Sequence, residues 1–314
     1  MTQKITTNQQ SHVAVFGAAN VDISANTTLA LATGDSTPGS ISTTAGGVGR
    51  NIAENLARLG CIAHLISAVA DDLQGKFLLD HTRDAGVDVS TCSVLPGQTT
   101  GTYLSLNNPD GTLLAAVNDM AVLDLLNPSE LARHSATIYN TSTCVVDCNL
   151  SPVAIEFIMQ SSVGKPVFVD GVSSHKCLKI LPYLVQVHTL KINRLEAQAL
   201  TGLPVDSVGQ AIAAAQSLCA RGVINVVVSL GSGGVCWCAP GSHGHLSAIQ
   251  VEVINSNGAG DALTAGLVHG WLAGWPLEQA VRFANACAAL TMTCRGANHS
   301  DLSVAGALKL IREQ

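Results

Sequence analysis

Short apolar runs alternate along this chain with segments that have the spacing of helices, and this alternation limits the fold more than any other feature. The runs include residues 13–16, 167–169 and 226–228. Because successive residues of a strand point to opposite faces, a run that is apolar at every position must be covered on both faces. Intervening segments such as residues 48–60 carry apolar residues every three or four positions, which predicts helices. We therefore predict an α/β protein with a doubly wound, mostly parallel sheet between two helical layers.

Two stretches interrupt this alternation. Residues 24–45 are rich in Thr, Ser, Ala and Gly, and residues 97–118 have the pattern of a hairpin with NNPDG as its turn. We predict that together they form a small sheet that projects from the main domain as a lid. The chain has no repeats, charge blocks or low-complexity linkers, so we predict one domain over residues 13–314 after a flexible tail at residues 1–12.

Composition excludes several kinds of partner. The net charge is −6, and the 16 Lys and Arg residues form no basic run that would hold the phosphate backbone of a nucleic acid. No stretch of 18 uncharged apolar residues is present, and the polar first dozen residues lack the apolar core of a signal peptide. We expect a cytoplasmic protein that binds neither nucleic acid nor membrane.

The sequence NGAGD begins a helix with residues that carry almost no side chain. Gly258, Ala259 and Gly260 leave backbone N–H groups accessible at the positive end of the helix dipole, where anions bind. Asp261 follows directly, and a carboxylate beside a phosphate site is suited to take a proton from an attacking hydroxyl group. An isolated motif of this kind is equally explained by an acidic residue that merely favours the first helical turn.

Further motifs follow other predicted strands. AGGVGRN contains Gly46, Gly47 and Asn51, SLGSGG spans residues 229–234, and NRLE at residues 193–196 opens a helix. The chain contains neither the Walker pattern G-x-x-x-x-G-K-[ST] nor the dinucleotide pattern G-x-G-x-x-G with an acidic residue about 20 positions later. This absence disfavours a nicotinamide-dependent oxidoreductase.

In this order and spacing, the motifs GAANVD, AGGVGRN, NRLE, SLGSGG and NGAGD resemble those of the ribokinase-like (PfkB) family of sugar and nucleoside kinases, over essentially the whole chain. Within that family, NPDGTLLAAVNDM, VVDCNLS, VFVDGVSSHKC and HTLKINRLEA are most similar to the members that phosphorylate pseudouridine. The resemblance implies a three-layer α/β/α fold with a β-sheet lid, and transfer of phosphate from ATP, with Mg²⁺, to the 5′-hydroxyl of pseudouridine. Another nucleoside, ribose or a related sugar is the alternative acceptor, and a catalytically silent sugar-binding relative is the alternative that is not an enzyme.

The resemblance also implies roles for single residues, most of which are explained equally well as turn, cap or surface residues. Asp261 would be the catalytic base, and the amides of residues 258–260 would hold the transferred phosphoryl group. The positions that match substrate-binding residues are Asn20, Asp22, Gly46, Gly47 and Asn51. The positions that match nucleotide-binding residues are Asn193, Ser229, Gly231, Gly234, Gly258, Gly260 and Asn285. Glu196 and Asn193 would hold Mg²⁺ through water.

Several assignments stay open at the level of sequence. Ser36, Asn118, Asp119 and Asn149 are short polar residues that could contact the base of a nucleoside or simply form turns. Lys176 and Lys191 could reach substrate or phosphate, or be surface lysines. At residues 255–257 the chain has NSN where many relatives have Asp-Thr, so dependence on a monovalent cation such as K⁺ is uncertain. The free edges of the lid sheet make a homodimer contact through the lid plausible.

Overall fold

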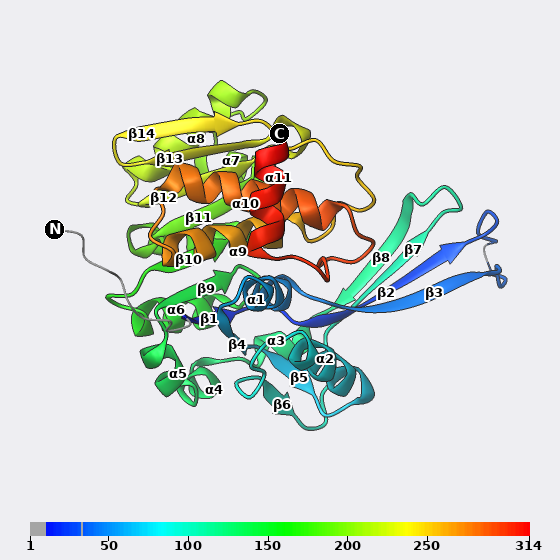
Figure 1. The fold of residues 1–314 in the computed structure, drawn as a ribbon. Coiled ribbons are helices and arrows are strands. Elements are labelled where there is room, and N and C mark those ends of the chain that lie inside the picture. Colours follow the sequence, from blue (N-terminus) through cyan, green and yellow to red (C-terminus); the bar gives the residue numbers. More distant parts are fainter. Residues whose placement is uncertain (1–10, 33) are drawn as a thin grey trace.

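The central sheet of the computed structural model has eight strands in the order β14-β13-β12-β11-β10-β9-β1-β4 (Figure 1). The structure describes residues 11–32 and 34–314, so residues 1–10 of the predicted tail lie outside the described residues. The six strands from β12 to β4 are parallel, and β13 and β14 are antiparallel at one edge. The strands are β1 His12–Phe16, β4 Ile62–Ile66, β9 Thr143–Asp147, β10 Val167–Asp170, β11 Thr189–Asn193, β12 Asn225–Ser229, β13 Val235–Ala239 and β14 Ser242–Leu246.

Both faces of this sheet are buried, as the apolar runs predict. In β1, Val13 and Val15 pack in one hydrophobic core, whereas Ala14 and Phe16 pack in the other. β12 divides in the same way, because Val227 faces the opposite core from its neighbours in the strand. Apolar side chains on both faces are stable only where helices cover both sides.

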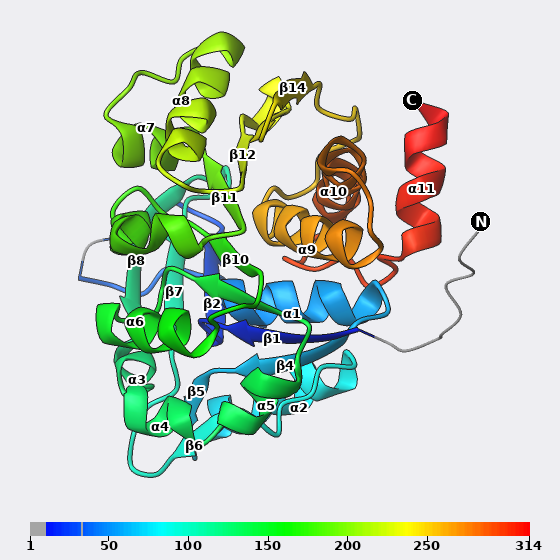
Figure 2. The same ribbon diagram turned by 90° about the vertical axis from the view of Figure 1, so that its left-hand side faces the viewer.

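Two helical layers provide this cover (Figure 2). α1, α9 and α10 lie against one face, and α6, α7 and α8 lie against the other. The helices are α1 Val48–Arg58, α2 Leu73–Asp84, α3 Ala121–Asp124, α4 Pro128–Ala132, α5 Ser135–Asn140, α6 Pro152–Ser161, α7 Arg194–Thr201, α8 Val208–Ala220, α9 Ala259–Leu272, α10 Leu277–Met292 and α11 Val304–Glu313, with 3₁₀ turns at Lys176–Gln186 and Gly231–Gly233. Among the residues that the structure describes, no helix has the length and apolarity needed to cross a membrane.

A second sheet of four strands projects from one end of the main sheet (Figure 1). Its order is β3-β2-β7-β8, with β2 and β7 parallel and the other two pairs antiparallel. The strands are β2 Asn20–Thr27, β3 Gly39–Gly46, β7 Thr102–Asn107 and β8 Leu113–Asp119. This is the predicted lid, although β2 begins at Asn20, before the predicted segment, because it pairs with β3 from Asn20 opposite Gly46.

The predicted fold class, a three-layer α/β/α arrangement with a mostly parallel sheet and a small second sheet, is confirmed. One element is absent from the prediction. A parallel pair, β5 Ala68–Ala70 and β6 Ser93–Leu95, forms a separate two-stranded sheet. Strands of three residues are too short to leave a periodic signal in the sequence.

Candidate active site

The carboxyl ends of the parallel strands bring polar residues to one edge of the main sheet. Asp147, Asp170, Asn193 and Ser229 are the last residues of β9, β10, β11 and β12. Ligand sites of open α/β sheets lie at this edge. The lid rises from the same region, because β2 follows β1 after a turn of only three residues, at 17–19.

The predicted phosphate-binding turn begins α9 at this edge. Gly258 precedes the helix with a φ of +77°, and a side chain there would collide with the carbonyl oxygen of Ala297. Glycine is therefore required by conformation and by space. The first N–H groups of a helix have no partner within the helix, so those that follow Gly258 can receive an anion.

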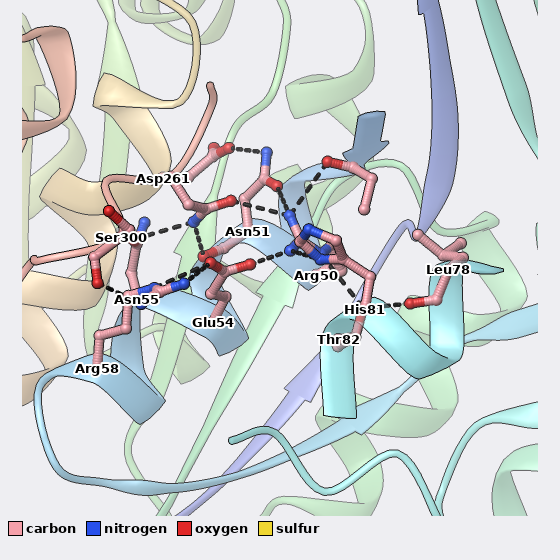
Figure 3. A network of polar contacts seen from close by, with 12 residues as sticks. Arg50, Asn51, Glu54, Asn55, Arg58, Leu78, His81, Thr82, Asp261 and Ser300 are labelled. Atoms are coloured by element: carbon pink, nitrogen blue, oxygen red, sulfur yellow. Dashed lines mark hydrogen bonds and ion pairs between the residues drawn. The ribbon is translucent and has the colours of Figure 1, made fainter. Parts of the chain in front are cut away.

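Asp261 lies in the first turn of α9 and is nearly buried. Its exposed fraction is 8%, and its Oδ2 accepts a hydrogen bond of 2.8 Å from Nδ2 of Asn51 in α1 (Figure 3). Burial and the nearby carboxylate of Asp170 raise the pKa of Asp261 to about 8, although Lys191 and Asn51 act in the opposite direction. A carboxylate whose pKa lies near neutrality is well matched to general base catalysis.

A buried cation lies directly beside this turn. Nζ of Lys191 is 3.1 Å from Oδ2 of Asp170, which also accepts a 2.7 Å hydrogen bond from Oγ1 of Thr264 in α9. A Cβ added to Gly260 would lie 2.7 Å from Nζ of Lys191. The ammonium group thus occupies the space that a side chain at residue 260 would need, and it adds positive charge next to the predicted anion site.

The residues predicted to bind the acceptor meet where the lid joins α1. Nδ2 of Asn20 donates a 2.6 Å hydrogen bond to Oδ1 of Asp22, and a side chain at Gly46 would collide with the Asp22 carboxylate. Burial raises the pKa of Asp22 despite the Asn20 hydrogen bond and the charge of Arg50. Gly47 has a φ of +99° and turns the chain from β3 into α1, which carries Asn51. The start of α1 therefore adjoins both Asp22, which is predicted to bind the acceptor, and Asp261.

On the other side of Asp261 the structure has a cavity of about 350 Å³. Its mouth is formed by the turn after β12 and by the start of α9, and apolar residues of α10 and of residues 248–253 form much of its wall. The predicted nucleotide-binding residues that line it are Ser229, Gly231, Gly234, Gly260 and Asn285. A cavity lined mostly by apolar residues with a few polar ones, beside the predicted anion site, is of the kind that binds small molecules.

The profile of the family described as pfkB family carbohydrate kinase matches residues 10–304. The chain belongs to this family. It is 40% identical over 304 residues to the pseudouridine kinase of Escherichia coli (strain K12), which covers 96% of this chain and 97% of that protein. It is 38% identical to the uncharacterized sugar kinase YeiI of the same organism, over 96% of this chain and 84% of that protein.

Solved structures agree with this membership. A putative sugar kinase from Clostridium perfringens matches with a TM-score of 0.86 and 28% identity, over 98% of this chain and 97% of that one. The ribokinase of Arabidopsis thaliana, solved with ribose and ATP, matches with a TM-score of 0.87 and 24% identity, over 97% of this chain and 99% of that one. The second likeness shows the fold alone.

In this pfkB-family kinase, the two residues predicted to hold Mg²⁺ bind each other. Asn193 caps α7 by accepting from the backbone N–H of Glu196, and Oε2 of Glu196 accepts a 2.9 Å hydrogen bond from the Asn193 backbone N–H. Burial raises the pKa of Glu196, whereas Lys191 lowers it. A Cβ added to Gly171 would lie 2.6 Å from Oε2 of Glu196, so the carboxylate occupies the space that a side chain at residue 171 would need. Oε1 of Glu196 accepts a further hydrogen bond of 2.5 Å from Nδ2 of Asn193, so both carboxylate oxygens are bonded to Asn193, and the role of this pair in holding Mg²⁺ through water stays a prediction.

Most of the residues predicted to contact the base of a nucleoside lie in positions that do not suit that role. Ser36 is exposed in the loop between β2 and β3, at the outer end of the lid (Figure 1). Asp119 accepts a hydrogen bond from the N–H of Ala121, which is a turn role. Asn149 accepts a 2.6 Å hydrogen bond from Nζ of Lys176 at the end of β9.

Asn118 is better placed to contact a base, because the lid strands bring it into register with Asp22, which is predicted to bind the acceptor. In the register of the lid, Asp22 is opposite Tyr103, and Tyr103 is opposite Asn118. Paired residues of neighbouring strands share a face, so these three side chains form one row. Tyr103 belongs to the predicted hairpin, but nothing in the sequence alone identified it as a site residue.

Two further observations concern residues that the sequence analysis assigned differently or left out. The amide of Asn285 donates a 2.9 Å hydrogen bond to the carbonyl oxygen of Ser247, so it helps to hold the wall of the cavity. The buried residues Arg50 and Glu54 and the partly exposed Arg58 form a charge network along α1, and none of them was selected from the sequence. Their spacing of four residues, with alternating charge on one helix face, is the signal that could have identified them.

Proposed function

We propose that this kinase transfers the γ-phosphoryl group of ATP to the 5′-hydroxyl of pseudouridine, giving pseudouridine 5′-phosphate and ADP. The observation that carries this proposal is the 40% identity, across 96% of the chain, to the pseudouridine kinase of Escherichia coli. The geometry supports it, because Asp261 bonds Asn51, a predicted acceptor residue, while its neighbours Ala259 and Gly260 line the cavity, which gives the order acceptor, Asp261, cavity. Phosphoryl transfer needs the attacking hydroxyl, the base and the transferred phosphoryl group to be arranged in this order.

In the proposed reaction, Asp261 accepts the proton of the 5′-hydroxyl as that oxygen attacks phosphorus. The backbone N–H groups of residues 258–260 bind the oxygens of the transferred phosphoryl group, and the Lys191 ammonium adds a fixed positive charge beside them. Mg²⁺ would neutralise phosphate charge and would be held through water by Asn193 and Glu196.

Dependence on K⁺ stays a separate question. Nδ2 of Asn255 donates a 2.8 Å hydrogen bond to the carbonyl oxygen of Arg295. An amide N–H therefore occupies a position from which that carbonyl could otherwise contact a cation.

We further propose a cytoplasmic homodimer joined through the lid. Both edge strands of the lid, β3 and β8, have unpaired edges in the described chain, and Ile41, Leu113 and Val117 of these strands are exposed. Exposed apolar side chains beside open strand edges favour association.

The kinase should prefer pseudouridine to uridine and to free ribose. The carbon-linked isomer carries an N–H that uridine lacks, and an acceptor placed against it would be left unpaired when uridine binds. Loss of such a hydrogen bond should lower kcat/KM by about 5- to 10²-fold. The measurement is ADP release at saturating ATP with pseudouridine, uridine, other nucleosides and ribose. If kcat/KM for pseudouridine were equal to or lower than that for uridine, the pseudouridine assignment would be wrong and the kinase assignment would stand. No turnover with any acceptor would favour a catalytically silent sugar-binding protein.

Asp22→Ala should weaken binding of the acceptor and leave the affinity for the nucleotide nearly unaffected. The Asp22 carboxylate lies at the acceptor end, away from the cavity at Ser229 and Asn285. Loss of a hydrogen bond to a buried charge should raise the acceptor KM by about 10- to 10²-fold. Steady-state kinetics with each substrate varied in turn measures this, with Asp110→Ala in the exposed lid turn as the matched control. If the KM for ATP rose equally, Asp22 would be assigned to the wrong end of the site.

A further inference from the structure

Arg50 is a buried arginine in a place that is unfavourable for a cation. It is the third residue of α1, and its exposed fraction is 1%. The positive end of the helix dipole repels a cation there, and burial removes its hydration. Burial also lowers the pKa of Arg50 to about 10. An arginine in such a position is expected to make contacts that no neutral side chain could make.

The guanidinium group of Arg50 is surrounded by hydrogen-bond acceptors from several parts of the chain (Figure 3). Glu54, one turn along α1, provides the opposite charge and also binds Arg58. The other acceptors are the carbonyl oxygen of Ala45 at 3.2 Å, Oδ1 of Asn51 at 2.8 Å, Oγ1 of Thr82 at 3.3 Å, Nδ1 of His81 at 3.2 Å and Oδ1 of Asn298 at 2.9 Å.

The contact with Asn51 determines how that amide is oriented. A guanidinium group can only donate hydrogen bonds, so the amide oxygen of Asn51 must face Arg50. The amide nitrogen then faces Asp261, to which it donates the 2.8 Å hydrogen bond. A reversed amide would lose the bond to Arg50 and place its oxygen against the Asp261 carboxylate.

A second chain of contacts reaches the same helix end. Asn298 accepts from Arg50, and its Nδ2 donates to the carbonyl oxygen of Asn51 at 2.9 Å. The preceding residue, Ala297, packs its carbonyl group against Gly258. Arg50 therefore holds both the partner of Asp261 and the loop that packs on the start of α9.

We propose that Arg50 is a positioning residue for phosphoryl transfer, which fixes the Asn51 amide so that it orients the Asp261 carboxylate toward the acceptor hydroxyl. This inference rests on the proposed function, in which Asp261 is the base. In this role Arg50 affects turnover through Asn51 and contacts neither substrate.

Charge adds to this geometric role. Asp22 and Asp261 both interact with the Arg50 charge and raise its pKa against the effect of burial, so the cation is shared by the acceptor end and the base. By the same interaction the cation favours the ionised form of Asp261. The other charged or titratable groups that face Arg50 are Glu54, Arg58 and His81, and those that face Asp261 are Asp147, Asp170 and Lys191.

The test compares Arg50→Met with Arg58→Met in the full-length enzyme, over a range of pH. Both variants remove a cation from Glu54, but only Arg50 contacts Asn51. Arg50→Met should lower kcat by about 10- to 10²-fold, because small misplacements of a reacting group have effects of this size. It should leave the KM for ATP unchanged and move the acidic limb of the kcat profile to higher pH, since Asp261 loses groups that favour its ionised form. Arg58→Met should leave both kcat and the acidic limb close to those of the wild type.

A third variant separates positioning from charge. Arg50→Lys keeps the positive charge but lacks the planar fork that bonds Asn51 and Asn298 together. It should move the acidic limb less than Arg50→Met does and still lower kcat, and it carries the test alone if Arg50→Met does not fold. A wild-type kcat in Arg50→Lys, or equal effects of Arg50→Met and Arg58→Met, would overturn the positioning role while the wild-type activity stands. A wild type that phosphorylates none of the acceptors would overturn the proposed function and this inference together.

Discussion

Asp261→Asn is expected to lower turnover by about 10² or more, the scale of a lost general base. The substitution removes the proton acceptor but keeps an oxygen that can still accept the hydrogen bond from Asn51. The shape of the site and the binding of both substrates should therefore be retained. The measurement is kcat at saturating ATP and acceptor, with ATP affinity determined separately by titration calorimetry.

The control for this prediction is Asp206→Asn. Asp206 is exposed before α8, so the same chemical change there should leave turnover at the wild-type level. If Asp261→Asn also kept a turnover within a few-fold of the wild type, Asp261 would not be the base. Loss of ATP binding in the same variant would point to a damaged anion site.

Lys191→Met is expected to lower the free energy of unfolding by about 3–5 kcal/mol, because it leaves a buried charge without its partner. Nζ of Lys191 bonds the Asp170 carboxylate, whose side chain is 2% exposed. Burial alone would lower the pKa of Lys191, but Asp170, Asp261 and Glu196 outweigh it and raise that pKa. A raised folded-state pKa means that the stabilisation is fully present below the ordinary value of 10.5, including at neutral pH, and is lost only above it.

Lys76→Met is the matched control for stability. Lys76 pairs with Asp80 on the surface of α2, where its side chain is 74% exposed. Removing such a pair should change the free energy of unfolding by less than about 1 kcal/mol. Denaturant unfolding followed by circular dichroism compares the two variants. Equal losses would mean that the Lys191–Asp170 pair contributes no more than a surface pair.

The sequence by itself determined the layers of this protein and the position of the glycine turn that is predicted to bind phosphate. Strands such as β12, in which Val226, Val227 and Val228 are all buried, are readable because burial on both faces leaves a run of consecutive apolar residues. The turn at Gly258 is readable because its conformation and space admit only glycine, and the helix that follows begins at the next residue. These requirements involve only residues that are close in the chain, so they appear as patterns of consecutive residues in the sequence.

Only the tertiary structure decided which polar residues act together. Asn51 and Asp261 are 210 positions apart and meet because α1 and α9 pack on the same face of the sheet. Lys191 and Lys176 were equivalent in the sequence, yet Lys191 is buried beside Gly260 and Lys176 binds Asn149. The four-residue spacing relates Arg50 only to Glu54, whereas its contacts with Ala45, Thr82 and Asn298 come from parts of the chain that no spacing relates. A hydrogen-bond network depends on positions in space to within a few tenths of an ångström, and those positions are set only when the helices have packed against the sheet.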